Sequence, residues 1–214
     1  MRILIPAVAT VLAASSLLAQ ASPAPGDLAA RIQQRYSTIH DFTATFTLTT
    51  RGGLLSKETA VDRGKVLVKK PGRMRWTFDT GSKQEVVADG TEMYSYFPRD
   101  RFVQVTPLPK DDQASAALLF LAGRGNLARD FTPSLPANQR PAEWRLALTP
   151  KVKSSDFSLL TLVVDPASLQ IRGFVVNDTQ GGAQTFQLDN LRENQGLADK
   201  DFVFKIPTGV DVRR

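Results

Sequence analysis

Residues 42–49 read Phe-Thr-Ala-Thr-Phe-Thr-Leu-Thr, so apolar side chains alternate with threonines at every position. Side chains of a β-strand point alternately to opposite faces of the sheet. The stretch therefore predicts a strand with one apolar and one hydroxylated face. A strand of this kind is typical of a sheet that buries one face and leaves the other in water.

Strand patterns recur along the chain with short turns between them, among them the turn dipeptides Pro71-Gly72 and Asp89-Gly90. Short turns favour an antiparallel sheet over alternating strands and helices. Ten further strands are predicted, over residues 57–70, 73–80, 83–88, 91–97, 101–106, 143–149, 157–165, 169–178, 183–190 and 202–206. Eleven strands in one domain must curl or split into layers, so we expect a mainly β (α+β) fold built on an open, strongly curved antiparallel half-barrel.

Two segments interrupt the strands. Asp27 can cap a helix whose apolar residues recur at helical spacing up to residue 39. The insertion at 107–140 contains a helical run over residues 113–122 whose second half is apolar without interruption. A helix that is apolar all round is buried or covers something apolar. Segments 27–39 and 107–140 are therefore predicted to form a helical lid over the curved sheet.

The N-terminus has the pattern of a secretory signal peptide: a basic start at Arg2, an uncharged apolar stretch, and small residues around Ala21. We expect residues 1–21 to be cleaved near Ala21, which leaves a single domain over residues 22–214. No cysteine stands at the cleavage point, so the pattern does not predict a lipid-modified N-terminus.

The composition argues against most catalytic chemistry. The chain of 214 residues has no cysteine and one histidine, which excludes thiol nucleophiles, disulfides, several-histidine metal centres and Cys-rich zinc sites. His40 precedes Asp41, but adjacent residues rarely orient one another as a catalytic triad requires. The acids and serines form no catalytic pattern, so we predict no enzyme, no catalytic residue, no cofactor and no metal site.

Basic residues outnumber acidic ones by 27 to 21, and four of them, Lys69, Lys70, Arg73 and Arg75, cluster around one turn. A solvated strand face is the favoured interpretation, with contact to an anionic headgroup or an acidic protein as the alternative. An exported protein meets little nucleic acid, so none is expected as a partner. Lys70 differs from its neighbours, because alternation places it on the same side as Val66 and Val68.

Large apolar residues recur on one side of consecutive strands. They can form an ordinary packed core, or they can line a container that the lid covers. In the second interpretation Lys70 lies at the rim of the container. The residues predicted to line it are Phe46, Leu48, Val66, Val68, Met74, Trp76 and Phe78 of the strands and Leu118 and Leu119 of the lid.

Five stretches resemble the periplasmic outer-membrane lipoprotein carriers of the Lol sorting pathway: 64–76, 86–94, 144–151, 186–190 and 202–212. The resemblance covers nearly the whole chain after residue 21. It implies an open eleven-stranded barrel with a helical lid. In that family an arginine directly before a turn proline fastens the lid; the matching residue here is Lys70. Met74 matches an aromatic cavity position, and Trp76 matches directly.

The resemblance implies a monomeric periplasmic chaperone that binds the acyl chains of lipoproteins. Its cargo would be acylated lipoproteins released by an inner-membrane ABC transporter, and an outer-membrane lipoprotein receptor would take them over. The alternative is a related periplasmic lipid-binding or stress-sensing protein with the same half-barrel and a different hydrophobic ligand. The receptor of the pathway shares the architecture but is itself a lipoprotein, which the lack of cysteine argues against.

Overall fold

The computed structural model describes residues 23–53, 58–81, 83–108, 125–137, 139–153 and 157–214. The predicted signal peptide and the predicted helix at 113–122, with Leu118 and Leu119, lie outside the described residues. Within them, no helix combines the length and hydrophobicity needed to cross a bilayer.

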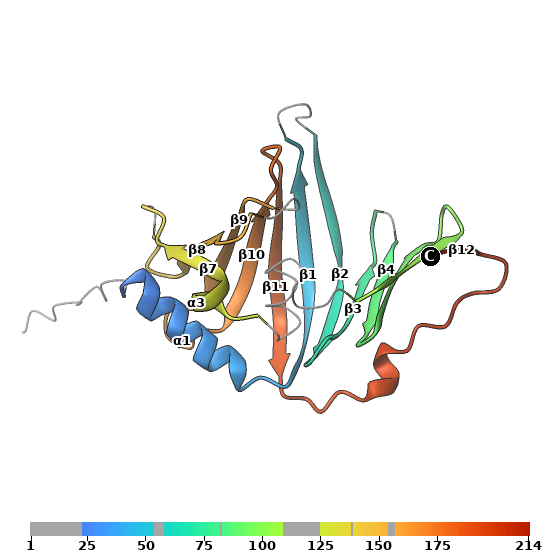
Figure 1. The fold of residues 1–214 in the computed structure, drawn as a ribbon, viewed down its shortest axis with the longest axis horizontal. Helices are drawn as coiled ribbons and strands as arrows, with labels where there is room; N and C mark the ends of the chain where they lie inside the picture. The colour runs from blue at the N-terminus through green and yellow to red at the C-terminus, as the bar shows by residue number, and fades with distance from the viewer. Residues whose placement is uncertain (1–22, 54–57, 82, 109–124, 138, 154–156) are drawn as a thin grey trace, which may run out of the picture.

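One open sheet of twelve strands contains every strand of the described chain (Figure 1). Its spatial order is β12-β6-β5-β4-β3-β2-β1-β11-β10-β9-β8-β7, and all neighbours are antiparallel except β12, which pairs with β6 in parallel. The strands are β1 (Asp41–Arg51), β2 (Thr59–Lys69), β3 (Arg73–Phe78), β4 (Glu85–Asp89), β5 (Glu92–Phe97), β6 (Phe102–Pro107), β7 (Phe131–Ser134), β8 (Trp144–Pro150), β9 (Leu159–Val164), β10 (Ile171–Asn177), β11 (Ala183–Glu193) and β12 (Asp211–Arg213).

The open, mainly β half-barrel predicted from the sequence is confirmed, with twelve strands in place of eleven. The predicted strand at 202–206 is wrong. The 3-10 helix η1 (Asp199–Phe202) ends there, and the chain runs on without a strand partner until β12. Two strands were not predicted, β7 and β12. Both are short, β7 contains Pro133, and β12 is exposed at all three positions, so neither carries an alternating pattern.

Helix α1 (Pro25–Ser37) packs on one face of the sheet, called the inner face from here on, next to the short helix α3 (Leu127–Asp130) and strands β7 and β8 (Figure 1). Its buried side is made by Leu28, Ala29, Ile32 and Tyr36. The expected cap at Asp27 is wrong. Pro25 begins the helix after Ala24, and Asp27 lies in the first turn, where its negative charge favours the helix dipole.

The C-terminal segment, residues 194–213, runs along the lower edge of the molecule in Figure 1 and covers the outer face of β3 to β6. Phe202 is completely buried, and so are Val87 and Val103 of the outer face. The Phe204 ring stacks on Tyr94 at 5.4 Å between centroids. The sheet therefore has a large inner core under α1 and a small outer core under the C-terminal segment.

The buried carboxylate of Asp41 fastens the start of this segment. It accepts backbone hydrogen bonds from Gln195 (2.6 Å), Gly196 (2.9 Å) and Leu197 (3.1 Å). A single acidic side chain at the beginning of β1 thereby satisfies three consecutive N–H groups where the chain leaves β11. These charge-assisted bonds hold the C-terminal segment against the sheet.

Candidate functional site

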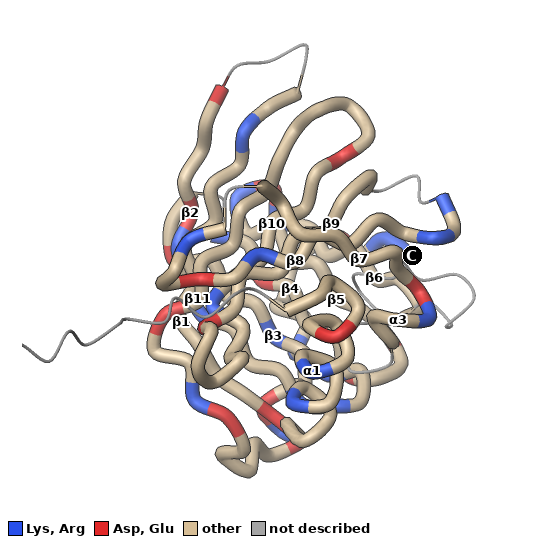
Figure 2. Tube along the Cα trace, turned by 90° about the vertical axis from the view of Figure 1, so that its left-hand side faces the viewer, with Lys and Arg blue, Asp and Glu red and all other residues tan. Residues whose placement is uncertain are grey.

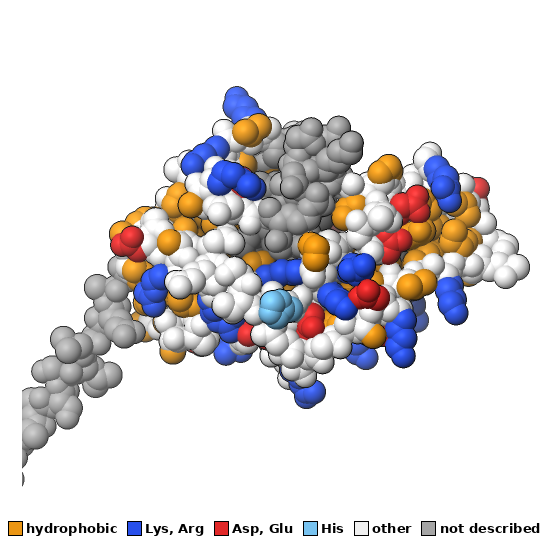
Figure 3. All heavy atoms as spheres, turned by 60° about the horizontal axis from the view of Figure 1, so that its bottom comes forward, with side chains coloured by type: hydrophobic (Ala, Val, Ile, Leu, Met, Phe, Trp, Pro, Cys, Tyr) orange, Lys and Arg blue, Asp and Glu red, His pale blue; other side chains and the backbone are white. Residues whose placement is uncertain are grey.

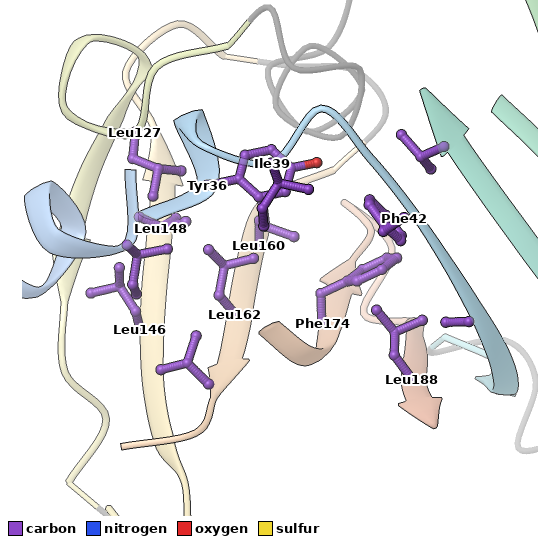
Figure 4. Close-up of a cluster of buried hydrophobic side chains, with 14 of the residues drawn as sticks. Tyr36, Ile39, Phe42, Leu127, Leu146, Leu148, Leu160, Leu162, Phe174 and Leu188 are labelled. Atoms are coloured by element: carbon purple, nitrogen blue, oxygen red, sulfur yellow. The ribbon is translucent and has the colours of Figure 1, made fainter. Parts of the chain in front are cut away.

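An apolar cavity of about 30 Å³ lies between α1 and the inner face of the sheet. Figure 4 shows how its walls are built: Tyr36 and Ile39 approach from the end of α1, and Phe174 and Leu188 face them from the sheet. The described lining residues are Ile32, Arg35, Tyr36, Ile39, Phe42, Trp76, Leu169, Ile171, Phe174, Leu188, Leu191 and Glu193.

Aromatic rings continue from the cavity along the inner face. Phe46 contacts Trp76 and Phe78 edge to face, with both pairs of centroids 5.1 Å apart. Phe186 lies 5.4 Å from Trp76 and stacks on Phe174 at 4.5 Å. Rings in such arrangements gain about 0.5–1.5 kcal/mol per pair beyond the area that they bury. The centre of the sheet therefore presents one continuous aromatic surface.

The predicted lining residues occupy this inner face, but they differ in their relation to the cavity. Among the described residues that line it, Trp76 is the one that the sequence pattern named. Phe78 is half-buried beside Phe46. The remaining described candidates are buried in the inner core, with at most 8% of the side chain exposed: Phe46, Leu48, Val66, Val68 and Met74.

Most of the cavity wall comes from residues that sequence analysis did not name among the lining residues. Ile32 and Tyr36 belong to α1 and Ile39 follows it, all within the segment predicted as a lid, and Phe174 and Leu188 belong to β10 and β11. Both of these strands were predicted, and Leu188 alternates with polar neighbours, whereas Phe174 lies between Gly173 and Val175. Nothing in the sequence indicated that β11 pairs with β1 and that β10 follows β11 in the sheet.

Lys70 follows β2 and turns its side chain under the end of α1. Its Nζ donates a hydrogen bond to the backbone carbonyl of Tyr36 and lies 3.4 Å from the centre of the Tyr36 ring. Helix C-termini carry a partial negative charge, and an aromatic face attracts a cation. The two contacts attach the last turn of α1 to the turn between β2 and β3, in which Lys70 precedes Pro71.

A second polar contact attaches α1 from the opposite side. Arg35 donates from Nη2 to the Glu193 carboxylate at the end of β11 and from Nε to the Ser168 carbonyl, both at 2.7 Å. The Gln170 side chain donates to the other oxygen of Glu193 at 3.3 Å. The C-terminal half of α1 is thus held by polar contacts to β11, to the loop before β10, and to Lys70.

Burial shifts the pKa values of Lys70 and Tyr36. Loss of water lowers the pKa of Lys70 from 10.5 to about 8, while the negative charge of Glu193 acts in the opposite direction. Burial also raises the pKa of Tyr36 far above its ordinary value, and Glu193 adds to the rise. The Tyr36 phenol therefore stays neutral over the whole range in which Lys70 titrates.

The other residues considered for chemistry have structural roles or lie in solvent. His40 is exposed on the surface that Figure 3 brings forward, and its backbone N–H donates to Asn194. Lys69 pairs with Asp199, and Arg75 pairs with Glu85 and donates to two carbonyls of the C-terminal segment. Over the described ranges, no group of three metal-ligating side chains comes together.

Comparison with known proteins assigns this chain to a family. The family model described as outer membrane lipoprotein carrier protein LolA matches residues 37–205. An outer-membrane lipoprotein carrier protein of Methylobacillus flagellatus is 30% identical over 149 residues, which cover 70% of this chain and 71% of the relative. The carrier protein of Bordetella avium is 29% identical over 209 residues, 94% of this chain and 92% of the relative.

Among solved structures, an uncharacterized conserved protein from Thermus thermophilus superposes with a TM-score of 0.54 and 15% identity, over 88% of this chain and 98% of that one. This likeness concerns the fold alone. The sequence match extends from the last turn of α1 to the C-terminal segment, and therefore includes Lys70, Trp76 and nearly the whole sheet. The chain belongs to the LolA family of outer-membrane lipoprotein carriers.

Proposed function

We propose that this protein is a periplasmic chaperone that binds the acyl chains of lipoproteins released from the inner membrane and delivers them to a receptor on the outer membrane. The observation that carries the proposal is the apolar cavity between α1 and an aromatic inner face. Arg35 and Glu193 line it, and Lys70 contacts its wall residue Tyr36. Each methylene kept from water is worth about 0.8 kcal/mol, so an acylated cargo needs such a shield in transit.

The cavity must enlarge to take an acyl chain. Its volume is about 30 Å³, whereas pockets that hold drug-sized ligands measure roughly 300–1,000 Å³. The two sides of the cavity belong to different elements, α1 on one side and β10 and β11 on the other. Separation of α1 from the sheet therefore opens it, and the polar contacts of Lys70 and Arg35 oppose that separation.

The remaining parts of the proposal follow from the family. Residues 1–21 are an export signal cleaved near Ala21, and residues 22–214 form the single carrier domain, with segments 27–39 and 107–140 as lid elements. The predicted lining residues of the inner face, from Phe46 to Phe78, and Lys70 as the lid fastener are part of the same proposal. An inner-membrane ABC transporter supplies the lipoprotein, an outer-membrane receptor accepts it, and the carrier works as a monomer.

A binding assay with a synthetic triacylated lipopeptide tests the cavity directly. Leu191→Glu introduces a carboxylate into the cavity wall at a half-buried position. Its matched control is Val61→Glu, since Val61 is 48% exposed and its register partner Thr49 belongs to the hydroxylated face of β1. We expect the cavity variant to bind the lipopeptide at least tenfold more weakly and the control to bind like the parent.

Equal affinities of the two variants would contradict the cavity assignment. A native-source preparation without detergent tests the cargo itself, because mass spectrometry of the purified protein identifies what co-purifies. Recovery of acylated lipoproteins supports the proposal. Recovery of free phospholipid alone would instead favour the related lipid-binding proteins of the same half-barrel.

A further inference from the structure

We propose a second binding site on the outer face of the sheet, a groove that receives a phosphate group. The groove measures about 210 Å³ and crosses the middle of the sheet over β2, β1 and β11. Its lining residues are Thr43, Ala44, Thr45, Lys65, Val66, Leu67, Asn190 and Arg192. None of them lines the acyl-chain cavity, which lies on the opposite face.

A β-bulge creates the groove. Thr43 is paired with Arg192 and Thr45 with Asp189, so that β11 uses two residues where β1 uses one. The extra residue brings Asn190 into the left-handed region at a φ of 53°. A bulge locally bends its strand and redirects side chains, and bulges are enriched beside functional sites. This one places the Asn190 amide against Thr45 and pairs Arg192 with Thr43 of β1.

The floor of the groove is polar and already ordered. Thr45 donates a hydrogen bond from Oγ1 to the Asp189 carbonyl and accepts one from the Asn190 amide, both at 3.2 Å. Thr43 lies beside Arg192 in the register. Its hydroxyl makes no hydrogen bond within the described structure, so that hydroxyl remains available to a ligand.

Two cations flank this floor. Lys65 is paired with Thr45 on one side of β1, and Arg192 with Thr43 on the other. Their backbones are therefore separated by two strand spacings of roughly 5 Å each and by an offset of two residues along β1. Both side chains are exposed, and in the described part of the chain neither makes an ion pair or a hydrogen bond through its side chain. Long side chains from both sides can close on an anion held over β1.

Three other basic residues of this face, Lys69, Arg73 and Arg75, pair with acids, either Asp199 in the C-terminal segment or Glu85. Lysine and arginine are dispersed along the chain with aspartate and glutamate, as Figure 2 shows. Lys65 and Arg192 make no such pair within the described residues, and they lie on either side of the groove.

A phosphate group fits these residues best. A guanidinium presents parallel N–H donors to two oxygens of a phosphate, an ammonium adds a point charge, and a threonine hydroxyl can donate to a third oxygen. Asp189 is the carboxylate at the neighbouring register position; its side chain accepts from the Gln187 amide at 3.2 Å and does not line the groove. The ligand is therefore an oxyanion of small size, either free phosphate or the phosphate of a lipid headgroup.

NMR titration of the ¹⁵N-labelled chain 22–214 tests the site, with inorganic phosphate added at constant ionic strength. We expect saturable shifts at the amides of Thr43, Thr45 and Asn190. Lys65→Gln/Arg192→Gln should weaken binding roughly tenfold, since an exposed charge contact contributes up to about a fivefold factor. Lys200→Gln/Lys205→Gln removes the same charge from exposed positions of the C-terminal segment and should leave the affinity unchanged.

A second arm separates the two sources of the phosphate. Co-sedimentation with phosphatidylglycerol vesicles, against phosphatidylcholine vesicles as reference, reports binding to a lipid headgroup. Groove-dependent binding in either arm supports the site, and the arm that responds identifies the source. Shifts confined to other amides, or equal binding by both double variants, would overturn it. Lipopeptide affinity of the groove variant should match the parent, so a failure here is distinct from a failure of the carrier proposal.

Discussion

Two charged residues of the sheet approach the last turns of α1 from different strands. Lys70 reaches the Tyr36 carbonyl from the end of β2, and Glu193 reaches Arg35 from the end of β11. Both contacts act on the C-terminal half of the helix, whereas its N-terminal half is held by apolar packing of Leu28 and Ile32. Under the proposed function, these side chains set how readily the helix leaves the cavity.

Replacement of Lys70 tests this role at the level of a single side chain. Lys70→Met keeps most of the stem and removes both the donor and the charge, so the open form is favoured. Because an acyl chain fits only the open form, we expect bound lipopeptide to leave the Met variant several-fold more slowly in a stopped-flow competition experiment. Lys70→Arg retains a donor and a cation and should release at a rate near that of the parent. Equal release from Met and parent proteins would exclude Lys70 as a fastener.

The pKa of Lys70 predicts a pH dependence of the same release. The closed form holds Lys70 with a pKa of about 8, and the solvated open form holds it near 10.5, so the open form binds more protons between these values. The closed form therefore gains stability as the pH rises from about 8 towards 10.5. The closed form excludes the acyl chain, so release should be faster at pH 9.5 than at pH 7.5, and Lys70→Met should abolish this difference. A parent protein that releases more slowly at pH 9.5 would contradict the assignment.

Among the elements, β1, β2 and β3 approach one another closely at Gly64. Gly64 of β2 lies opposite Phe46 and Phe78, and a Cβ built there would overlap the Thr77 carbonyl oxygen and lie 2.7 Å from the Phe46 ring. The absence of a side chain lets the two aromatic rings meet over the strand, at 5.1 Å between centroids. Glycine is required here for close approach, and the aromatic surface depends on it.

Gly64→Ala should therefore destabilise the fold. Overpacking of a core costs about 1–3 kcal/mol, and the nearest obstruction is backbone that cannot rotate away. Urea denaturation followed by tryptophan fluorescence measures the change. Gly26→Ala is the matched control, because a Cβ at that position of α1 meets nothing within 4 Å, and alanine favours a helix by up to about 1 kcal/mol. A stable Gly64→Ala protein would refute the packing argument.

The whole molecule consists of one sheet with apolar contacts on both faces. The inner face carries α1 and the cavity, and the outer face carries the C-terminal segment with Phe202 completely buried. A fixed core covers only part of the inner face of this open sheet. The rest of that face can therefore hold a cavity that changes in size. The outer core stabilises β3 to β6 without taking part in the cavity.

This division predicts that stability and binding can be separated. Phe202→Ala should lower the free energy of unfolding by about 3–5 kcal/mol, as for other buried phenylalanines. The folded fraction should bind the triacylated lipopeptide with the affinity of the parent, because Phe202 lies on the outer face. Denaturation curves and titration at low temperature measure the two effects. A parallel loss of affinity in the folded protein would show that the two cores are coupled.

The class of the molecule and most of its strands follow from the amino-acid sequence alone. Alternation at Phe42 to Thr49 reports which side of a strand is buried, and that information is local, so the predicted and observed strands agree closely along most of the chain. The same signal failed at residues 202–206, because Phe202 and Phe204 alternate while packing on a sheet in which they are not paired. Periodicity records burial, and it does not record hydrogen-bond partners.

Which residues contact one another depends on the tertiary fold. The pairing of β1 with β11 brings Leu188 and Glu193 beside Phe42, although about 150 positions of chain separate them. The same pairing produces the bulge at Asn190 and the groove on the outer face. Lys70 could be placed on the apolar side by alternation, but its contact with Tyr36 depends on where α1 crosses the sheet. Such contacts arise from packing between elements distant in sequence, and no local pattern encodes them.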